Sequence, residues 1–310
     1  MRIVSLLPSA TEILCGIGLQ DSLVGVSHEC DHPEAVRSIP TVTQSLIPTN
    51  LTSQQIDQHV REQWQASSPH ALYRLDRERM IDLAPDLIVT QSVCDVCAVA
   101  EDDVRQATQA MSQPPAILNL EPVNASGVLD CIRLVGQATD RDEASSRFAA
   151  SLEQRIDHIR ERNRELAHHP SVVFLEWVDP LFTAGHWTPE LIETAGGVEM
   201  LGVAGTKSRT IAWEHLVQAD PEILVVACCG YDVEQTRRDV PVLANQSGWE
   251  SLQSVRNGNL FVADGSSYFN RPGPRIVDSI EILAHCFHPE LHALPTPLTQ
   301  AVQRVNVSCI

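Results

Sequence analysis

The sequence has little positive charge. Its 310 residues include 40 Asp and Glu but only 22 Lys and Arg, and the net charge is −18. Lys207 is the single lysine. Nucleic acids and anionic membranes are bound by basic surfaces. The composition therefore argues against both as partners and leaves small ligands open.

Long apolar runs and common catalytic motifs are also missing. No run approaches the roughly 20 apolar residues of a membrane-spanning helix, so we expect no membrane insertion. The sequence contains no G-x-S-x-G, P-loop or H-E-x-x-H motif. We therefore expect a binding protein and not an enzyme.

The cysteines do not form the pattern of a disulfide-rich secreted domain. Nine cysteines are an odd number, and they are scattered along a long chain. The first residues, MRIVSLLPSATEILCG, have a short apolar run that Pro8 and Glu12 interrupt, which is unlike a signal peptide. We therefore predict reduced thiols and a cytoplasmic location, or a periplasmic one if the N-terminus is incomplete.

Apolar runs alternate with helical patterns along most of the chain. Each run is followed by a turn or by the start of a helix, as in parallel strands that are covered on both faces. The first part contains RIVSLL, SLVGVS, DLIVTQ and PAILNL, and the second contains SVVFLEW, EILVVA and NLFVAD. The pattern predicts an α/β protein with two lobes of mainly parallel sheets.

A long amphipathic segment separates the two series of strands. Residues 140–169 contain no Pro or Gly, and apolar residues recur there at helical spacing. We predict one long rigid helix between the lobes, with a ligand cleft between them at the carboxyl ends of the strands. The predicted parts are an N-terminal lobe at 1–139 with a helical insertion at 52–80, the linking helix at 140–169, a C-terminal lobe at 170–293 and a loosely attached tail at 294–310.

Two clusters of chemically active side chains follow strands of the first lobe. His28, Glu29 and Cys30 follow one strand, and Cys94 and Cys97 form a C-x-x-C pair after another. That spacing suits a metal knuckle or a redox pair. A zinc or iron site would combine His28, Cys30, Cys94 and Cys97; the alternatives are a thiol oxidoreductase, or thiols that line a pocket for a large apolar ligand.

The second lobe concentrates aromatic residues at the ends of its strands. The whole sequence has only 14 Phe, Trp and Tyr, and a broad flat ligand is best held against aromatic faces. His186 could supply an axial nitrogen to a ligand-bound metal. Arg271 could donate hydrogen bonds, and the amides of Pro8-Ser9-Ala10 at a predicted helix start could do the same. The predicted contact residues of this lobe are Trp177, His186, Trp187, Cys228, Tyr231, Tyr268, Phe269 and Arg271.

Several segments taken in order resemble the vitamin B12-binding proteins, whose class has two lobes joined by a single helix. They include RIVSLLPSATEIL, LVGVSHECDHP, APDLIVTQ, PLFTAGHW and RPGPRIVDSIEIL. The resemblance implies that the protein holds cobalamin or a related corrinoid without catalysis. It would pass the ligand to an ABC transporter permease or act as an intracellular carrier.

Overall fold

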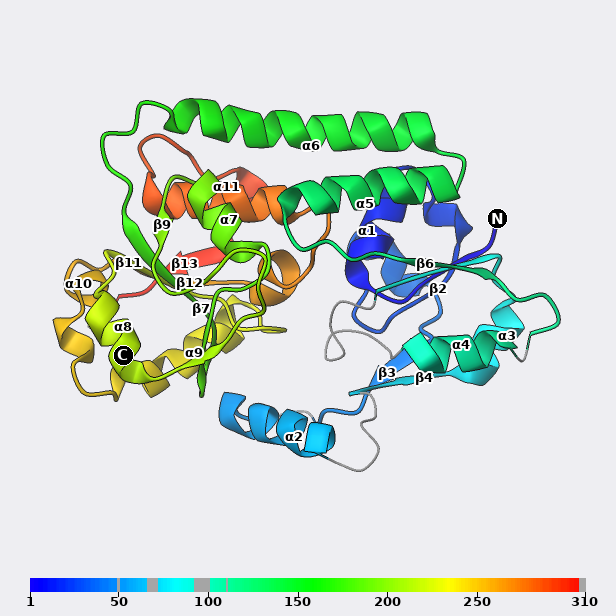
Figure 1. Ribbon diagram of the computed structural model, residues 1–310, viewed down its shortest axis with the longest axis horizontal. Helices are drawn as coiled ribbons and strands as arrows, with labels where there is room; N and C mark the ends of the chain where they lie inside the picture. The colour runs from blue at the N-terminus through cyan, green and yellow to red at the C-terminus, as the bar shows by residue number, and fades with distance from the viewer. Residues whose placement is uncertain (49–50, 66–71, 92–100, 110, 307–310) are drawn as a thin grey trace. The chain divides into compact units, whose positions relative to one another are not determined.

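The computed structural model describes residues 1–48, 51–65, 72–91, 101–109 and 111–306 (Figure 1). It divides into two compact units. Unit 1 comprises Met1–Pro122 and Ser126–Ser151, and unit 2 comprises Val123–Ala125 and Leu152–Ile310. Within the described ranges, no helix is long and apolar enough to cross a lipid bilayer.

Unit 1 is built on a four-stranded parallel sheet in the order β2-β1-β5-β6. All four strands come from the apolar runs of the first half of the sequence. The strands β1 and β5 are buried along their whole length, as expected for central strands with cover on both faces. The strands are β1 (Ile3–Ser5), β2 (Leu23–Val26), β5 (Leu87–Thr90) and β6 (Ala116–Asn119).

Helices and short helical turns connect the strands of unit 1. A core cluster around Val4, Ile88 and Val104 joins the sheet to its helices and is closed by Met80. The described helices and 3-10 turns are α1 (Pro8–Gly16), η1 (Gln20–Ser22), η2 (Glu34–Ser38), α3 (Arg77–Leu83), α4 (Glu101–Gln109) and α5 (Ala125–Ala138).

The predicted helical insertion at 52–80 is only partly helical. It contains α2 (Ser53–Gln65), but β4 (Tyr73–Leu75) follows and pairs antiparallel with β3 (Thr43–Ser45). The expectation of a helical insertion is wrong as far as Tyr73–Leu75 is concerned. Tyr73 and Leu75 pack against the core while Arg74 between them is exposed, which is the alternation of a strand. Asp76 then caps α3 by accepting a hydrogen bond from the Arg79 amide.

Unit 2 contains a larger mixed sheet in the order β10-β8-β7-β11-β12-β13, with β9 also paired to β7. The central strands β7, β11 and β12 are parallel to each other, and β8, β10 and β13 run antiparallel to their neighbours. The strands are β7 (Ser171–Val178), β8 (Leu181–Thr183), β9 (Val198–Glu199), β10 (Thr210–Ile211), β11 (Ile223–Val226), β12 (Leu260–Ala263) and β13 (Val302–Arg304).

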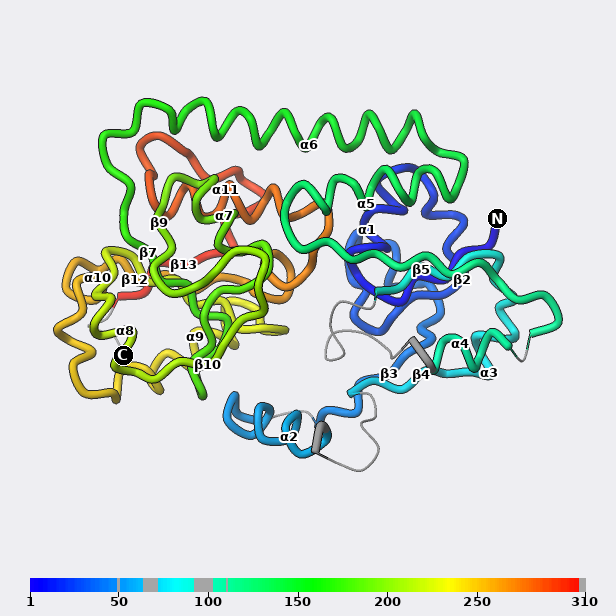
Figure 2. The backbone as a smooth tube through the Cα atoms, in the orientation of Figure 1, coloured from blue at the N-terminus to red at the C-terminus, as the bar shows by residue number. Residues whose placement is uncertain are grey.

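Helices pack against this sheet, with α7 and α11 on one side and α9 on the other (Figure 1). Figure 2 traces the chain from α7 through β9 to β10, the part of unit 2 that returns to the sheet edge. The helical elements are α7 (Thr188–Thr194), α8 (Trp213–Ala219), α9 (Val233–Ala244), η3 (Trp249–Ser251), α10 (Gln253–Arg256), the π-helical turn η4 (Gly265–Phe269), α11 (Ile276–Phe287) and η5 (Thr296–Leu298).

The expectation of a loosely attached tail at 294–310 is wrong for residues 294–306, the part that the structure describes. The strand β13 pairs with β12 from Phe261 to Ala263, and the Asp264 amide donates to the Ala301 carbonyl at 2.9 Å. Leu298, Ala301 and Val305 are buried. Burial of these apolar side chains and the backbone ladder attach the segment to the sheet.

The long helix α6 (Asp142–Asn163) begins in unit 1 and ends in unit 2. It is shorter than the predicted range 140–169. Asp140 adopts a left-handed conformation with φ 55°, which separates α6 from α5. At the other end, the Asn163 side chain donates to the Thr194 carbonyl at 3.0 Å and lies 2.7 Å from His292 Nε2, so tertiary contacts hold the end of the helix.

Arg155 joins α6 to α11 within unit 2. Its guanidinium donates to both carboxylate oxygens of Glu281, at 3.0 and 2.8 Å, and to Asp278 at 2.5 Å. Burial raises the pKa of Asp278, and the ion pair with Arg155 opposes that shift. Because the two acids are mostly buried, removal of the cation that they share leaves two neighbouring negative charges without their ion-pair partner, and only the charge of Arg275 still acts on Asp278.

We expect Arg155→Met to lower the free energy of unfolding by about 2 kcal/mol. Arg147→Met is the matched control, because Arg147 pairs with the exposed Glu143 one turn away on the same helix. Its expected effect is within about 0.5 kcal/mol. Urea unfolding of both variants checks this, and equal losses would contradict the role assigned to Arg155.

Candidate ligand-binding site

The carboxyl ends of β7, β11 and β12 lie side by side in unit 2 because these strands are parallel neighbours. The chain leaves β7 at Trp177 and Val178, leaves β11 into the turn that carries Cys229 and Tyr231, and leaves β12 into η4. In open α/β sheets, ligands bind at this edge. The loop after β8 is joined to η4 by a hydrogen bond from Trp187 to the Phe269 carbonyl. We call the half-buried and exposed side chains of these turns and of that loop the tip surface: His186, Cys229, Tyr231 and Tyr268.

Direct contacts bring most of the predicted second-lobe residues together. The rings of Trp177 and Tyr231 lie 5.2 Å apart, and those of His186 and Trp187 lie 5.5 Å apart. The Trp187 indole nitrogen donates to the Phe269 carbonyl at 3.0 Å, which ties the loop before α7 to η4. The contacts join Trp177 to Tyr231 and Trp187 to Phe269, and a hydrogen bond from the Ser266 amide to the Tyr231 carbonyl at 3.0 Å connects η4 to the turn after β11.

The predicted contact residues of unit 2 differ in burial: some are exposed enough to touch a ligand, and others lie in the core beneath them. Trp177 and Trp187 are largely buried, and Phe269 is a core residue whose ring centroid lies 5.0 Å from that of Phe174. His186, Tyr231 and Tyr268 keep part of their surface exposed. The aromatic contact surface is therefore smaller than predicted, and Phe269 supports it from below.

The choice of Cys228 as a contact residue is not supported by its position. Cys228 is fully buried, whereas the adjacent Cys229 is exposed and accepts a hydrogen bond from Asn270 Nδ2 at 2.7 Å. Successive side chains of an extended segment point to opposite sides, so only one of the two can reach the surface. The structure places Cys229 there.

Arg271 and Arg275 follow η4 and differ in their surroundings. Arg271 is buried, and its guanidinium lies 3.5 Å from the Ser266 hydroxyl in the preceding turn. The Arg275 guanidinium lies 5.4 Å from the centre of the Tyr268 ring, within cation–π range. Both side chains hold the turn that presents Tyr268, and the direct ligand contact predicted for Arg271 remains a prediction.

His186 is the imidazole of the tip surface. Its backbone is left-handed, with φ 51°, and is held by hydrogen bonds to Thr206 and Gly205. Burial and the nearby Lys207 lower the pKa of His186. Both effects favour the neutral imidazole, which is the form that binds metal. A strained non-glycine backbone held by its surroundings is often found at functional sites.

The tyrosine hydroxyls of the tip surface stay protonated at neutral pH. Burial raises the pKa of Tyr231 to about 12, with further contributions from Asp239 and Cys228. Burial also raises the pKa of Tyr268, and the nearby Arg275 opposes this. The two phenols are therefore suited to donate hydrogen bonds to a ligand.

Two acids of unit 2, one buried and one half-buried, were missed at the level of sequence. Glu176 is buried on β7, and its carboxylate accepts a hydrogen bond from the Gly185 amide at 2.8 Å. Glu199 on β9 accepts hydrogen bonds from the Leu201 and Gly202 amides at 3.0 and 2.9 Å. Burial raises the pKa of Glu199 to about 7 although backbone amides oppose the shift, and the charge of Glu176 adds to it. Both acids hold the segment that includes His186 and Lys207.

The predicted residues of unit 1 form a separate group. Cys30 is buried with its sulfur 3.1 Å from the Thr11 hydroxyl, and His28 Nδ1 lies 2.7 Å from the Thr43 hydroxyl. His28 Nε2 lies 3.3 Å from a carboxylate oxygen of the exposed Glu29. Ser9 and Ala10 are buried in the first turn of α1, and Pro8 is partly exposed.

Cys94 and Cys97 lie outside the described residues. In the described part of the chain, no three His, Cys, Asp or Glu side chains are arranged to hold a metal ion. The four-residue metal set remains a prediction, since two of its members are not described.

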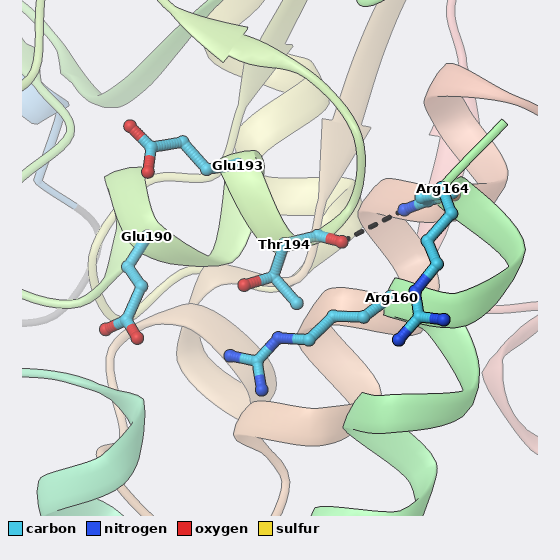
Figure 3. Close-up of a pocket in the computed structure, with 6 residues that line it drawn as sticks. Arg160, Arg164, Glu190, Glu193 and Thr194 are labelled. Carbon is cyan, nitrogen blue, oxygen red and sulfur yellow. Dashed lines mark hydrogen bonds between the residues drawn. The ribbon is translucent and has the colours of Figure 1, made fainter. Parts of the chain in front are cut away.

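A shallow polar pocket of about 360 Å³ lies elsewhere in unit 2, between α6 and α7. Figure 3 shows Arg160 on α6, Arg164 directly after the end of that helix, and Glu193 pointing away from Arg160. The Glu190 carboxylate accepts a hydrogen bond from the Ala125 amide, and Arg160 and Arg164 pair with the nearby acids Asp157 and Glu161 of α6. Three of the lining side chains are thus used in contacts within the protein, and we place the candidate site at the tip surface.

The model of the periplasmic binding protein family matches residues 3–266. The chain belongs to this family. It is 23% identical over 294 residues to the ABC transporter substrate-binding lipoprotein YvrC of Bacillus subtilis, covering 93% of this chain and 80% of that protein. It is 22% identical over 287 residues to the vitamin B12-binding protein of Vibrio cholerae, covering 90% and 86%.

Solved structures show the same fold. A periplasmic heme-binding protein from Pseudomonas aeruginosa has a TM-score of 0.73 and 19% identity, covering 98% of this chain and 99% of that one. The Vibrio cholerae vitamin B12-binding protein BtuF has a TM-score of 0.66 and 20% identity, covering 92% and 96%. The predicted two-lobe α/β fold is confirmed, and the family agrees with a solute-binding protein that is not an enzyme.

The prediction of a cytoplasmic location is wrong. The matching family is that of the periplasmic binding proteins, and the chain is similar to the lipoprotein YvrC. The first residues do not indicate a compartment, because Ile3–Ser5 form a buried strand of the core. The thiols do not indicate one either, because Cys30, Cys131, Cys228 and Cys286 are buried, and burial protects a thiol in any compartment.

Proposed function

We propose that this periplasmic binding protein holds a corrinoid such as cobalamin against the tip surface of unit 2 and delivers it to an ABC transporter permease. The observation that carries the proposal is a neutral imidazole, His186, beside the ring of Trp187, whose indole is hydrogen-bonded to η4, the turn that carries Tyr268. A corrinoid offers a flat apolar ring to the aromatics and a cobalt ion to the imidazole.

The similarity to vitamin B12-binding proteins supports this ligand class, because it extends over 90% of the chain. The tip surface also suits the periphery of a corrinoid. The amide side chains around the corrin ring can accept hydrogen bonds. The protonated phenols of Tyr231 and Tyr268 can donate them. An acidic protein has no electrostatic attraction for anionic macromolecules, which agrees with a small-molecule ligand.

The test is a spectroscopic titration with hydroxocobalamin and with a cobinamide, which lacks the nucleotide base. We expect binding of at least one of them, with a shift of the corrin absorption bands when the imidazole reaches the cobalt. His186→Ala should abolish that shift and weaken binding about tenfold, or about 1.4 kcal/mol. His215→Ala is the control, since His215 is exposed on α8 in the same unit.

Hemin is titrated in parallel. Binding of hemin with no response to either corrinoid would overturn the corrinoid proposal in favour of a haem-binding protein. Corrinoid binding with an unchanged spectrum in the His186 variant would contradict the axial role of His186 and leave the aromatic contacts to account for the affinity.

A further inference from the structure

Glu176 is an ionisable residue inside an otherwise apolar strand. Its neighbours on β7, Leu175 and Trp177, are buried, and so is Glu176 itself. Burial raises the pKa of Glu176, and hydrogen bonds from three donors oppose that shift. A buried carboxyl group destabilises a protein unless its oxygens are satisfied, so these donors define what the residue does.

The donors come from two separate stretches of the chain. The Gly185 amide donates at 2.8 Å, and the hydroxyl groups of Thr188 and Ser208 also donate to the carboxyl group. In addition, the backbone carbonyl of Glu176 accepts a hydrogen bond from the Cys229 amide at 3.0 Å. One residue therefore fixes the start of α7, the segment before β10 and the turn after β11.

Two partners of Glu176 adjoin residues of the loop before α7, the third adjoins Lys207, and the fourth belongs to the tip surface. Gly185 precedes His186, Thr188 follows Trp187, and Ser208 follows Lys207. Cys229 belongs to the tip surface directly. The hydrogen bonds to Glu176 thus set the backbone positions from which His186 and Trp187 extend.

The packing around these hydrogen bonds leaves no room for an alternative arrangement. A Cβ atom on Gly185 would lie 2.2 Å from the Ser208 amide nitrogen, so the two backbone segments touch. The next residue, His186, is held in the left-handed region at φ 51°. A backbone conformation of this kind persists only where the surrounding structure holds it.

We infer that Glu176 is a positioning residue for the tip surface, which holds His186 and Trp187 in the arrangement that receives the ligand. This inference rests on the proposed function at the same surface. Glu176 need not touch the ligand, because its carboxyl group is buried and engaged by its own chain.

Glu176→Gln tests the inference with almost no change in size. A glutamine keeps one acceptor oxygen but turns an NH2 group toward donors that pointed at the carboxylate. We expect about tenfold weaker hydroxocobalamin binding. We also expect the pKa of His186 to move toward its ordinary value, as followed by NMR titration of the histidine ring protons with His186→Ala for assignment.

Glu222→Gln is the matched control. Glu222 accepts hydrogen bonds from the Ser171 amide and hydroxyl at the opposite end of β7 and lies 2.8 Å from His168. Its replacement should change the stability of the same unit and leave corrinoid affinity and the His186 titration unchanged. If Glu176 had a purely structural role, Glu176→Gln, like Glu222→Gln, would leave corrinoid affinity and the His186 titration unchanged.

Ser208→Ala and Thr188→Val provide a second route if Glu176→Gln does not fold. Each removes one donor to Glu176, and each should produce a smaller change in the same direction in both measurements. Unchanged His186 titration in all variants that fold would overturn the inference. If the wild-type protein binds no corrinoid, the proposed function fails by itself, and the His186 titration alone still decides the role of Glu176.

Discussion

Glu199→Gln is expected to make the protein more stable at alkaline pH. Burial raises the pKa of Glu199 from its ordinary value of 4.5 to about 7. The folded state therefore holds a proton that the unfolded state releases more easily. The stability gained from this is fully present below about pH 4.5 and is lost as the pH rises through about 7.

A glutamine at position 199 cannot ionise, so the variant lacks the loss of stability that the ionisation of Glu199 causes across that range. The difference between variant and wild type should be small at about pH 4 and reach about 3 kcal/mol at about pH 8, from a shift of roughly 2.5 units at 1.36 kcal/mol each. The glutamine oxygen can still accept the hydrogen bonds from the Leu201 and Gly202 amides.

Urea unfolding at the two pH values measures the difference. Glu193→Gln serves as the control because Glu193 is exposed on α7 in the same unit. A difference that stays constant with pH, or a variant that is less stable at alkaline pH, would contradict the assignment of a raised pKa to Glu199.

The sequence predicts the central strands well because a central strand is marked by a continuous run of apolar residues in its own segment. Near-continuous apolar runs such as DLIVTQ and EILVVA contain β5 and β11, which are buried along their whole length. The edge strands β10 and β13 have two and three residues, and their side chains are mostly exposed. They form because backbone groups of a neighbouring strand are available, and no apolar pattern marks them.

The site is predictable in its aromatic part and less so beneath it. Residues at the ends of parallel strands converge whatever the loop geometry, so Trp177 and Tyr231 could be placed together. Which of Cys228 and Cys229 reaches the surface depends on the orientation of a single turn. Glu176 did leave a signal, an acid within the apolar run SVVFLEW, but its hydrogen-bond donors lie up to 32 residues away and appear only in the fold.

A last expectation concerns Gly265, where two strand ends meet. A Cβ atom on this residue would lie 2.2 Å from the Cys228 carbonyl oxygen and 2.9 Å from its carbonyl carbon. Both atoms belong to the backbone of the turn after β11 and cannot move aside alone. Next to this contact, the Ser266 amide donates to the Tyr231 carbonyl at 3.0 Å.

Gly265→Ala should therefore push η4 away from that turn and lower the free energy of unfolding by about 3 kcal/mol. Because η4 carries Tyr268 and the Phe269 carbonyl that accepts from Trp187, corrinoid affinity should fall as well. Gly230→Ala is the matched control, since Gly230 has φ 74° but a Cβ atom there would meet no described atom within 4 Å. Its cost is conformational, about 1 kcal/mol. Equal losses of unfolding free energy for the two variants would show that the approach of Gly265 to Cys228 does not constrain the fold. The expected larger loss for Gly265→Ala measures the steric clash with Cys228, because the Gly230→Ala control accounts for the conformational cost of replacing a glycine.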